Sequence, residues 1–328
     1  MKIMITGATG FVGQVLMQKL LEEGHTVHVL VRNPDKAKIF THERTKIFYG
    51  NINNRDSIFE AMNGCEQVYH VAGSTDVWIK KPGDSIAINY HGTINVYETA
   101  VRCKVNRVVF TSSAGIMGPS YAAPLTETSP RVTAIEIEYE LSKKMAEEIT
   151  AEYVQKGLDV VIVRPTKVFG GNNTDGRFHF TKFIQQFLKN KLVVIPGPGD
   201  YNANFCFVDD VAKGHILAMK YGKPGDAYIL GGANISYWEF FNLIRKHTGM
   251  RANIIKVPQH VVKFWAYMQQ SLYILFRIKP LYTPQSVKIA FSHHVCSSDK
   301  AVRELNYSIT PLTDAIAKTI HSLKTSTL

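Results

Sequence analysis

The sequence predicts an α/β protein with a doubly wound parallel sheet and a smaller C-terminal domain. Short apolar segments rich in β-branched residues alternate with helical patterns through the first half of the chain. The first apolar segment, 2–6, runs through a glycine-rich turn into a helix. After residue 170 the alternation weakens, and glycine and proline cluster at 170–171 and 196–199. A sheet of this kind places its ligands outside the carboxyl ends of its strands.

The predicted elements follow in regular order. The strands cover residues 2–6, 26–31, 46–49, 67–72, 107–111 and 158–164. The helices cover residues 11–23, 55–63, 87–101 and 134–155. Residues 1–169 therefore form the predicted sheet domain, to which the chain returns near 205–232. Residues 170–204 and 233–328 form the smaller domain, which we expect to bind substrate.

Gly7, Gly10 and Gly13 occupy the turn between the first strand and the first helix. A Cβ in such a turn would disfavour positive φ and would hold the backbone away from a phosphate. Bare N–H groups at a helix N-terminus form an anion site, so the strand, turn and helix together predict a dinucleotide-binding site of the Rossmann type. A tight turn without a ligand is the alternative.

The end of the second strand favours NADP over NAD. NAD sites usually have an acid near this position, whereas an arginine suits the 2′-phosphate of NADP. The chain has Val31 and Arg32 here, followed by Lys36 and Lys38, so a phosphate would meet charged donors. The alternative is that Arg32 is only a surface cation.

Tyr139 and Lys143 lie four residues apart in the predicted helix 134–155. Side chains at this spacing share one helix face, so the phenol and the ammonium point into one site. A nearby cation favours phenolate, and we expect Lys143 to lower the pKa of Tyr139 toward the range of a working proton donor. An exposed helix pair is the alternative interpretation.

Five segments together resemble the extended short-chain dehydrogenase/reductase family, also called the NAD-dependent epimerase/dehydratase superfamily. They are TGATGFVG at 6–13, VYHVAG at 68–73, YELSK at 139–143, VRPTKVFG at 163–170 and FVDDVAKGH at 207–215. The set is most similar to the dihydroflavonol reductase-like branch and spans most of the chain. The resemblance implies hydride transfer between a nicotinamide cofactor and a small carbonyl or alcohol compound.

The resemblance also implies roles for single residues. Ser113 matches the catalytic serine that holds the substrate oxygen beside Tyr139, with Ser112 as the near alternative. Asn89 supports the proton-relay water or, equally, caps a helix start. Asn51 departs from the usual aspartate but can still accept from the adenine amino group. The implied cofactor contacts are Gly7, Thr9, Gly10, Phe11, Val12, Gly13, Arg32, Lys36, Asn51, Ile52, Ala72, Gly73, Tyr139, Lys143, Pro165 and Val168.

Three departures from related enzymes favour a reductase. Ser113, Ala114 and Gly115 stand where nucleotide-sugar dehydratases are expected to have Thr-Asp-Glu. Ala203 aligns with the arginine that binds the diphosphate in nucleotide-sugar epimerases, which also tend to retain NAD. We therefore predict an NADP(H)-dependent oxidoreductase that reduces the ketone or aldehyde of a small apolar or aromatic compound. The alternatives are a nucleotide-sugar epimerase or dehydratase, a 3-beta-hydroxysteroid dehydrogenase-like enzyme and a non-catalytic NADP-sensing regulator.

Composition and charge bear on metal binding, cellular location and nucleic-acid binding. The four cysteines are far apart and form no metal-ligand pattern, so we expect neither a metal site nor a disulfide framework. We also expect the protein to be located in the reducing cytoplasm. The first strand begins at residue 2, which leaves no room for a signal peptide. The net charge is +11, and residues 251–300 hold seven lysines and arginines against one acid, Asp299. No nucleic-acid-binding signature accompanies this basic region, so a solvated face is the favoured interpretation.

Residues 258–276 form the most apolar stretch outside the sheet. Their uncharged core, 264–276, is 13 residues long and too short to span a membrane, which takes about 20 residues. The pattern predicts an amphipathic helix whose apolar face holds Val261, Trp265, Met268, Leu272 and Leu275. Such a helix can pack on the core, form a lid over an apolar substrate or lie on an anionic membrane. Of these three roles we favour packing on the core, then the lid, and membrane contact last. The pattern leaves open whether the protein forms a homodimer.

Overall fold

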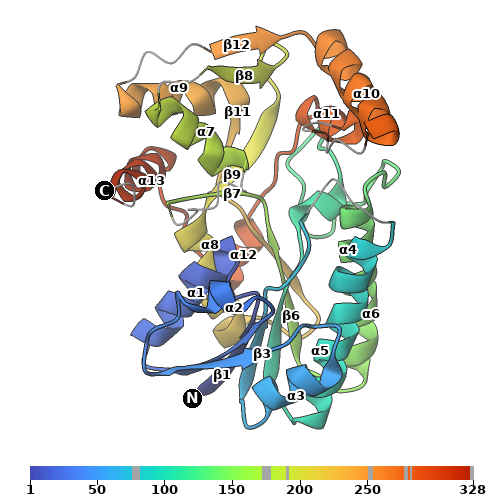
Figure 1. Ribbon diagram of the computed structural model, residues 1–328, viewed down its shortest axis with the longest axis vertical. Coiled ribbons are helices and arrows are strands. Elements are labelled where there is room, and N and C mark those ends of the chain that lie inside the picture. The colour runs from blue at the N-terminus through green and yellow to red at the C-terminus, as the bar shows by residue number, and fades with distance from the viewer. Residues whose placement is uncertain are drawn as a thin grey trace.

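The computed structural model describes residues 1–75, 82–171, 179–189, 192–249, 254–276, 280 and 283–325. A parallel sheet of seven strands forms the lower half of the molecule in Figure 1, in the order β10-β6-β5-β4-β1-β2-β3. This is the doubly wound arrangement that the sequence predicts. The strands are β1 (Lys2–Thr6), β2 (Thr26–Val31), β3 (Thr45–Tyr49), β4 (Gln67–His70), β5 (Arg107–Thr111), β6 (Val160–Pro165) and β10 (Ala227–Leu230).

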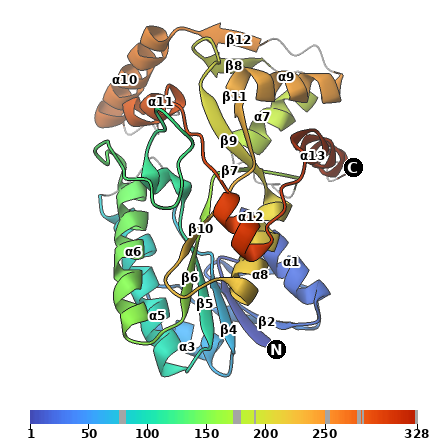
Figure 2. The same ribbon diagram turned by 180° about the vertical axis from the view of Figure 1, so that it is seen from behind.

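Helices cover both faces of this sheet (Figures 1 and 2). Each face has its own apolar core. One core packs Leu16 and Val211 against strand residues such as Val29, and the other packs Ile58 and Tyr97 against residues such as Val108. The helices are α1 (Phe11–Glu22), α8 (Val208–Tyr221) and α12 (Asp299–Leu305) on the first face, and α3 (Arg55–Met62), α5 (Gly92–Arg102) and α6 (Glu138–Gln155) on the second, with α2 (Pro34–Ala37) after β2.

The upper half holds two small sheets and the remaining helices. One sheet has the order β11-β9-β7 and the other pairs β12 with β8. Their strands are β7 (Lys167–Phe169), β8 (Val193–Pro196), β9 (Asn202–Phe207), β11 (Ala233–Ser236) and β12 (Ile254–Val257). The helices are α7 (His179–Leu188), α9 (Tyr237–Thr248), α10 (Gln259–Phe276), α11 (Pro284–Ala290) and α13 (Leu312–Thr325). The domain boundaries drawn from the sequence stay predictions.

Several predicted elements are confirmed residue for residue, among them the strands at 2–6, 26–31 and 107–111. Two predicted helix starts are wrong. The helix expected from 134 begins at Glu138, because residue Ile137 is extended and Arg131 donates to the carbonyl oxygens of Thr133 and Ala134. The helix expected from 87 is preceded by α4 (Asp84–Ile86), and its first turn, η1 (Ala87–His91), is a π-helix.

The glycine turn fixes how β1 meets its neighbour. Gly7 has a φ of +76°, and a Cβ built there would lie 2.6 Å from the backbone nitrogen of Ala72. Only glycine fits this position, because both the backbone angle and the space exclude a side chain. The carboxyl ends of β1 and β4 therefore meet closely at the upper edge of the sheet. Among the described residues, no helix is both long and apolar enough to cross a bilayer.

Candidate active site

The start of α1 is built for close approach of a ligand. Gly10 is the N-cap of α1 and has no side chain to bond the first N–H groups of the helix. A Cβ on Gly13 would lie 2.1 Å from the carbonyl oxygen of Gly7, so the helix packs directly on the turn. Bare N–H groups at a helix N-terminus suit the diphosphate of a dinucleotide. The glycine turn and the start of α1, which we call the cradle, thus fit the nicotinamide cofactor expected from the sequence.

Ser113 and Tyr139 meet above the end of β5. Tyr139 lies in the first turn of α6, and the Ser113 side chain lies close enough to its phenol to act on the pKa of Tyr139. The Ser113 Oγ accepts a hydrogen bond of 3.1 Å from the N–H of Gly115, which lies in the short 3₁₀ helix η2 (Ala114–Met117). Ser112 Oγ is buried and has no hydrogen-bond partner among the described residues. The structure therefore brings Ser113, and not Ser112, to Tyr139.

Lys143 lies one helical turn beyond Tyr139, with its ammonium buried. Its Nζ donates a 2.7 Å hydrogen bond to the carbonyl oxygen of Thr111. A Cβ on Gly73 would lie 3.0 Å from this Nζ and 2.9 Å from Asn89 Oδ1, so Gly73 leaves room beside both groups. Burial lowers the pKa of Lys143 to about 8, although Glu147 acts in the opposite direction. The lysine still carries its charge at neutral pH.

The pKa of Tyr139 shifts in the direction opposite to the one expected from its spacing with Lys143. Burial of the phenol raises the pKa of Tyr139, the hydrogen bond from Ser113 opposes this rise, and the charge of Glu140 adds to it. Lys143 is not among the groups that set this pKa, and burial of the phenol is the largest cause. The expectation that Lys143 lowers this pKa is therefore wrong for the structure described, and the phenol is protonated at neutral pH.

Asn89 lies in the π-helical turn η1 and does not cap a helix start. Its Oδ1 accepts a 2.8 Å hydrogen bond from the Ser74 N–H, and its Nδ2 donates to Ser74 O and to Ser142 Oγ at 3.0 and 2.9 Å. π-helical turns are frequent at functional sites because they re-aim a side chain. The amide therefore joins the segment after β4 to α6, the helix of Tyr139 and Lys143.

His70 is a structural histidine. Its Nδ1 lies 2.7 Å from Thr6 Oγ1, and its Nε2 lies 3.0 Å from Thr93 Oγ1. Thr6 Oγ1 also accepts from the Ala72 N–H, and Thr93 Oγ1 donates to the carbonyl oxygen of Asn89. Complete burial lowers the pKa of His70 to about 3, so the ring is neutral. This network connects the glycine turn to the π-helical turn, and the sequence gives no periodic signal for it.

The other predicted cofactor residues lie along the same edge of the sheet. Arg32 follows β2 and is exposed, and Lys36 is half-buried in α2. The Oδ1 of Asn51 accepts a 2.7 Å hydrogen bond from the Asn53 N–H, and Ile52 packs in the core beside Gly92. The remaining residues lie in the glycine turn and the first turn of α1, after β4, and at or beyond the end of β6: Thr9, Phe11, Val12, Ala72, Pro165 and Val168.

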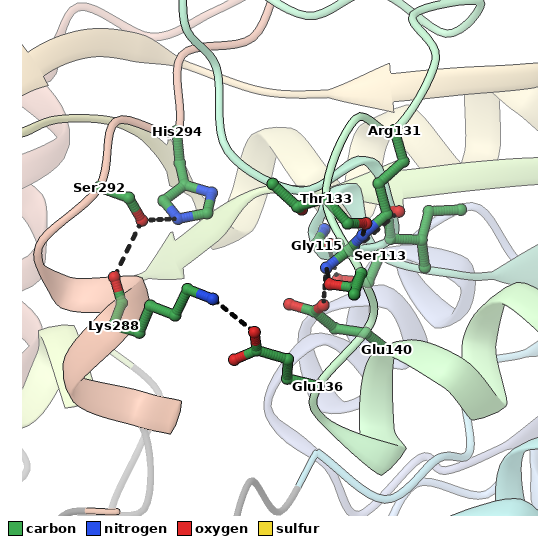
Figure 3. A network of polar contacts seen from close by, with 11 residues as sticks. Ser113, Gly115, Arg131, Thr133, Glu136, Glu140, Lys288, Ser292 and His294 are labelled. Carbon is green, nitrogen blue, oxygen red and sulfur yellow. Dashed lines mark hydrogen bonds and ion pairs between the residues drawn. The ribbon is translucent and has the colours of Figure 1, made fainter. Parts of the chain in front are cut away.

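Two ion pairs at the N-terminal end of α6 are absent from the sequence-based prediction (Figure 3). Arg131 and Glu140 form a buried pair, with 2.7 Å between Nη2 and Oε2. Lys288 of α11 pairs with Glu136, which precedes α6. Glu140 belongs to the YELSK segment, where its charge is the only available signal. Its partner Arg131 lies in the irregular segment before α6, and Lys288 lies 152 residues beyond Glu136, so no local pattern predicts either pair.

A hollow of about 250 Å³ lies elsewhere, between α8 and α13, and is lined by polar residues such as Asp209, Lys213 and Lys318. None of the predicted site residues lines it, so it does not compete with the edge of the sheet as the catalytic site. Among the described residues, no group of three or more His, Cys, Asp or Glu side chains is placed to hold a metal ion.

The chain belongs to the NAD dependent epimerase/dehydratase family, whose model matches residues 3–231. A Synechocystis protein with the provisional name dihydroflavonol 4-reductase is 30% identical, covering 97% of this chain and 93% of its own. Sterol-4-alpha-carboxylate 3-dehydrogenase (decarboxylating) of Mus musculus is 26% identical, covering 98% and 90%. The crystal structure of UDP-glucose 4-epimerase from Thermotoga maritima has a TM-score of 0.83 at 20% identity, covers all of both chains and shares the fold.

Together these findings define the class. The chain is an NAD(P)-dependent enzyme of the short-chain dehydrogenase/reductase type, an oxidoreductase or an epimerase. NAD(P) is the cofactor typical of this family.

Proposed function

We propose that the protein is an NADP(H)-dependent reductase that acts on a ketone or aldehyde of a small apolar compound, and that it also oxidises the corresponding alcohol. The observation that carries this proposal is the closeness of the Ser113 and Tyr139 side chains, with the buried Lys143 ammonium one turn further along α6. Two hydroxyl groups at one point can polarise a carbonyl oxygen, and the cradle around Gly7 and Gly73 has room for the cofactor.

Each residue has a defined task in this proposal. When bound, the nicotinamide supplies or accepts the hydride. Ser113 donates to the substrate oxygen and Tyr139 gives it a proton, which suits the raised pKa of this phenol because it remains protonated until it acts. Lys143 holds the cofactor ribose through donors left over from its bond to Thr111 O. Asn89 fixes the segment after β4 and supports the water that returns the proton.

NADP is the proposed cofactor because the residue after β2 is an exposed arginine. Arg32 can reach a 2′-phosphate from solvent at little desolvation cost, and Lys36 lies one turn away. No acid occupies the end of this strand, where an NAD site usually has one.

The proposed substrate is apolar because relatives that match this chain over nearly its whole length are named for flavonoid and sterol chemistry. Ala203 supports the same conclusion, because it is fully buried in β9 and offers no donor to a diphosphate. A sterol-type alcohol dehydrogenase is the second candidate, favoured by the likeness to the mouse enzyme. We place the substrate-binding part in the upper half of the molecule and the protein in the cytoplasm.

Turnover assays test this proposal. The purified chain is given NADPH or NADH with a dihydroflavonol, a 3-ketosteroid and an aromatic aldehyde, and NADP⁺ or NAD⁺ with the matching alcohols. UDP-glucose with NAD⁺ tests for epimerisation. We expect NADPH-dependent reduction of at least one apolar carbonyl compound and its loss in Tyr139→Phe. Turnover of UDP-glucose alone would replace the proposal with the epimerase function, and cofactor binding without any turnover would favour a regulator.

A further inference from the structure

Helix α10 presents its apolar side chains to solvent. Its inward side packs Ala266, which is fully buried, and the half-buried Val262 against α11 and Tyr201. The outward side carries Phe264 and Leu275, which are 70% and 71% exposed. Val261, Trp265, Tyr267 and Phe276 are exposed as well. The interpretation that the apolar face packs on the core, favoured by the sequence, is therefore wrong.

The outward residues form a continuous apolar face. With 3.6 residues per turn, all of its members fall within an arc of about 120° of the helix circumference. Met268 and Leu272 lie near the middle of the arc and are half-buried. Tyr267 and His260 lie beside the arc, whereas Lys263 lies about 160° from its centre. We call this set the α10 face: Val261, Phe264, Trp265, Met268, Leu272, Leu275 and Phe276.

The charge of the surrounding chain has one sign. Between Glu239 and Asp299 the sequence contains no aspartate or glutamate, but it contains eight lysines and arginines. Lys263 in α10 is exposed, whereas the Lys256 ammonium of β12 lies 3.9 Å from the centroid of the Trp238 ring. An apolar face with aromatic side chains in it, on a stretch of chain whose charges are all positive, matches the surface of an anionic bilayer.

We propose that α10 is an interfacial anchor that inserts its apolar face into the surface of an anionic lipid bilayer. The helix is not long and apolar enough to span the membrane, so in this proposal it lies in the plane of the interface. Trp265 and Tyr267 suit the headgroup level, because their rings are apolar and their polar ends remain hydrated. Lys263 is an exposed cation of this helix and adds to its attraction for an anionic surface.

The position of α10 separates this role from that of a lid. In both ribbon views α10 lies at an outer corner of the upper half, next to α11 (Figures 1 and 2). It is α11 that reaches the region of the catalytic residues, through the pair between Lys288 and Glu136. An anchor at α10 leaves the sheet edge and its proposed catalytic residues outside the bilayer. The proposal does not depend on the reaction catalysed.

Vesicle co-sedimentation tests the anchor. The protein is mixed with vesicles of phosphatidylcholine alone or of phosphatidylcholine with phosphatidylglycerol, at low and high salt. We expect binding to the mixed vesicles that weakens in high salt, because salt screens the cations around the helix. Phe264→Glu and Leu275→Glu should each reduce the partition coefficient about tenfold or more. Lys263→Gln should weaken binding to the mixed vesicles only.

Val132→Glu is the matched control, since Val132 is also 70% exposed but lies before α6. It should bind vesicles as the parent protein does, and all the variants should keep the parent melting temperature because the altered side chains are exposed. The proposal is overturned if the parent protein binds neither vesicle, or if Phe264→Glu binds as well as Val132→Glu. A dimer in size-exclusion chromatography that Phe264→Glu dissociates, without vesicle binding by the parent, would instead make the face a contact between copies. A change of KM for an apolar substrate without vesicle binding would make α10 a lid.

Discussion

The guanidinium of Arg131 joins the residue after Tyr139 to the segment after Ser113. Its Nη2 lies 2.7 Å from Glu140 Oε2, and its Nη1 donates to the carbonyl oxygens of Gly115 and Ile116 at 3.1 and 3.0 Å. Burial raises the pKa of Glu140, and Arg131 opposes this rise. One side chain thus holds the two elements whose separation sets the distance between the Ser113 and Tyr139 hydroxyl groups.

Arg131→Ala should lower both stability and turnover. The substitution leaves the buried Glu140 carboxylate without its partner, and removal of one member of a buried pair costs about 3–5 kcal/mol. The serine and tyrosine would also lose their common support, so kcat should fall more than the affinity for cofactor does. Urea unfolding and steady-state kinetics measure the two effects.

Arg164→Ala is the matched control for this prediction. Arg164 forms an equally buried pair with Glu147, two turns further along α6, with 2.6 Å between Nη2 and Oε2. It should lose comparable stability and keep most of its kcat. Equal losses of kcat in both variants would show that Arg131 acts only through general stability and does not position the catalytic residues.

Tyr139→Phe should keep cofactor affinity and lose most of the rate. The substitution removes one hydroxyl group, which is the proposed proton donor, and leaves Ser113 and Lys143 in place. General acid catalysis contributes about 10²–10⁴-fold, so a loss within this range is expected for carbonyl reduction. Fluorescence titration with NADPH and turnover measurements separate the two quantities. A rate within about threefold of the parent would exclude Tyr139 as the proton donor.

The sequence predicts the sheet and much of the site because their signals are local. Gly7, Gly10 and Gly13 belong to one turn of the chain, and Tyr139 and Lys143 lie one helical turn apart, so both patterns occupy short stretches of sequence. The partners that hold these residues lie outside the local pattern, as with Arg131 for Glu140 and Thr93 for His70. The pKa of Tyr139 is mispredicted because its spacing with Lys143 does not reveal that the phenol is buried. The amphipathic pattern of α10 is correct, but periodicity alone does not show which face is turned inward.

Stability should fall steeply as the pH drops below 6.5. Burial lowers the pKa values of His70 and His294 to about 3 and that of His215 to about 4, whereas each has a pKa near 6.5 when unfolded. In this range the unfolded chain binds protons that the folded chain excludes. The stabilising effect is therefore complete above pH 6.5 and is lost as the pH falls toward 4. Each histidine contributes about 1.4 kcal/mol per pH unit.

His215→Gln checks this assignment through the slope of stability against pH. His215 bonds Thr111 Oγ1 and Val211 O inside the core, so the variant is expected to be less stable at neutral pH. Its slope between pH 4 and 6.5 should be smaller than that of the parent by about 1.4 kcal/mol per pH unit. His42→Asn, at an exposed position, controls for loss of an imidazole. An unchanged slope in His215→Gln would mean that this ring is not excluded from protonation.

Arg32→Ala should change the preference between the two dinucleotides. Arg32 is exposed at the end of β2, where the 2′-phosphate of NADPH is proposed to lie. Hydrogen bonds to charged groups contribute about 1.5–3 kcal/mol, so the variant should bind NADPH roughly ten- to a hundredfold more weakly. NADH has no 2′-phosphate, and its affinity should stay nearly constant.

Lys38→Ala is the control, because Lys38 already pairs with Asp35 at 2.8 Å and lies four residues beyond the start of α2. Titration calorimetry with both cofactors measures the four affinities, and equal losses for NADPH and NADH in Arg32→Ala would show that Arg32 does not bind the phosphate.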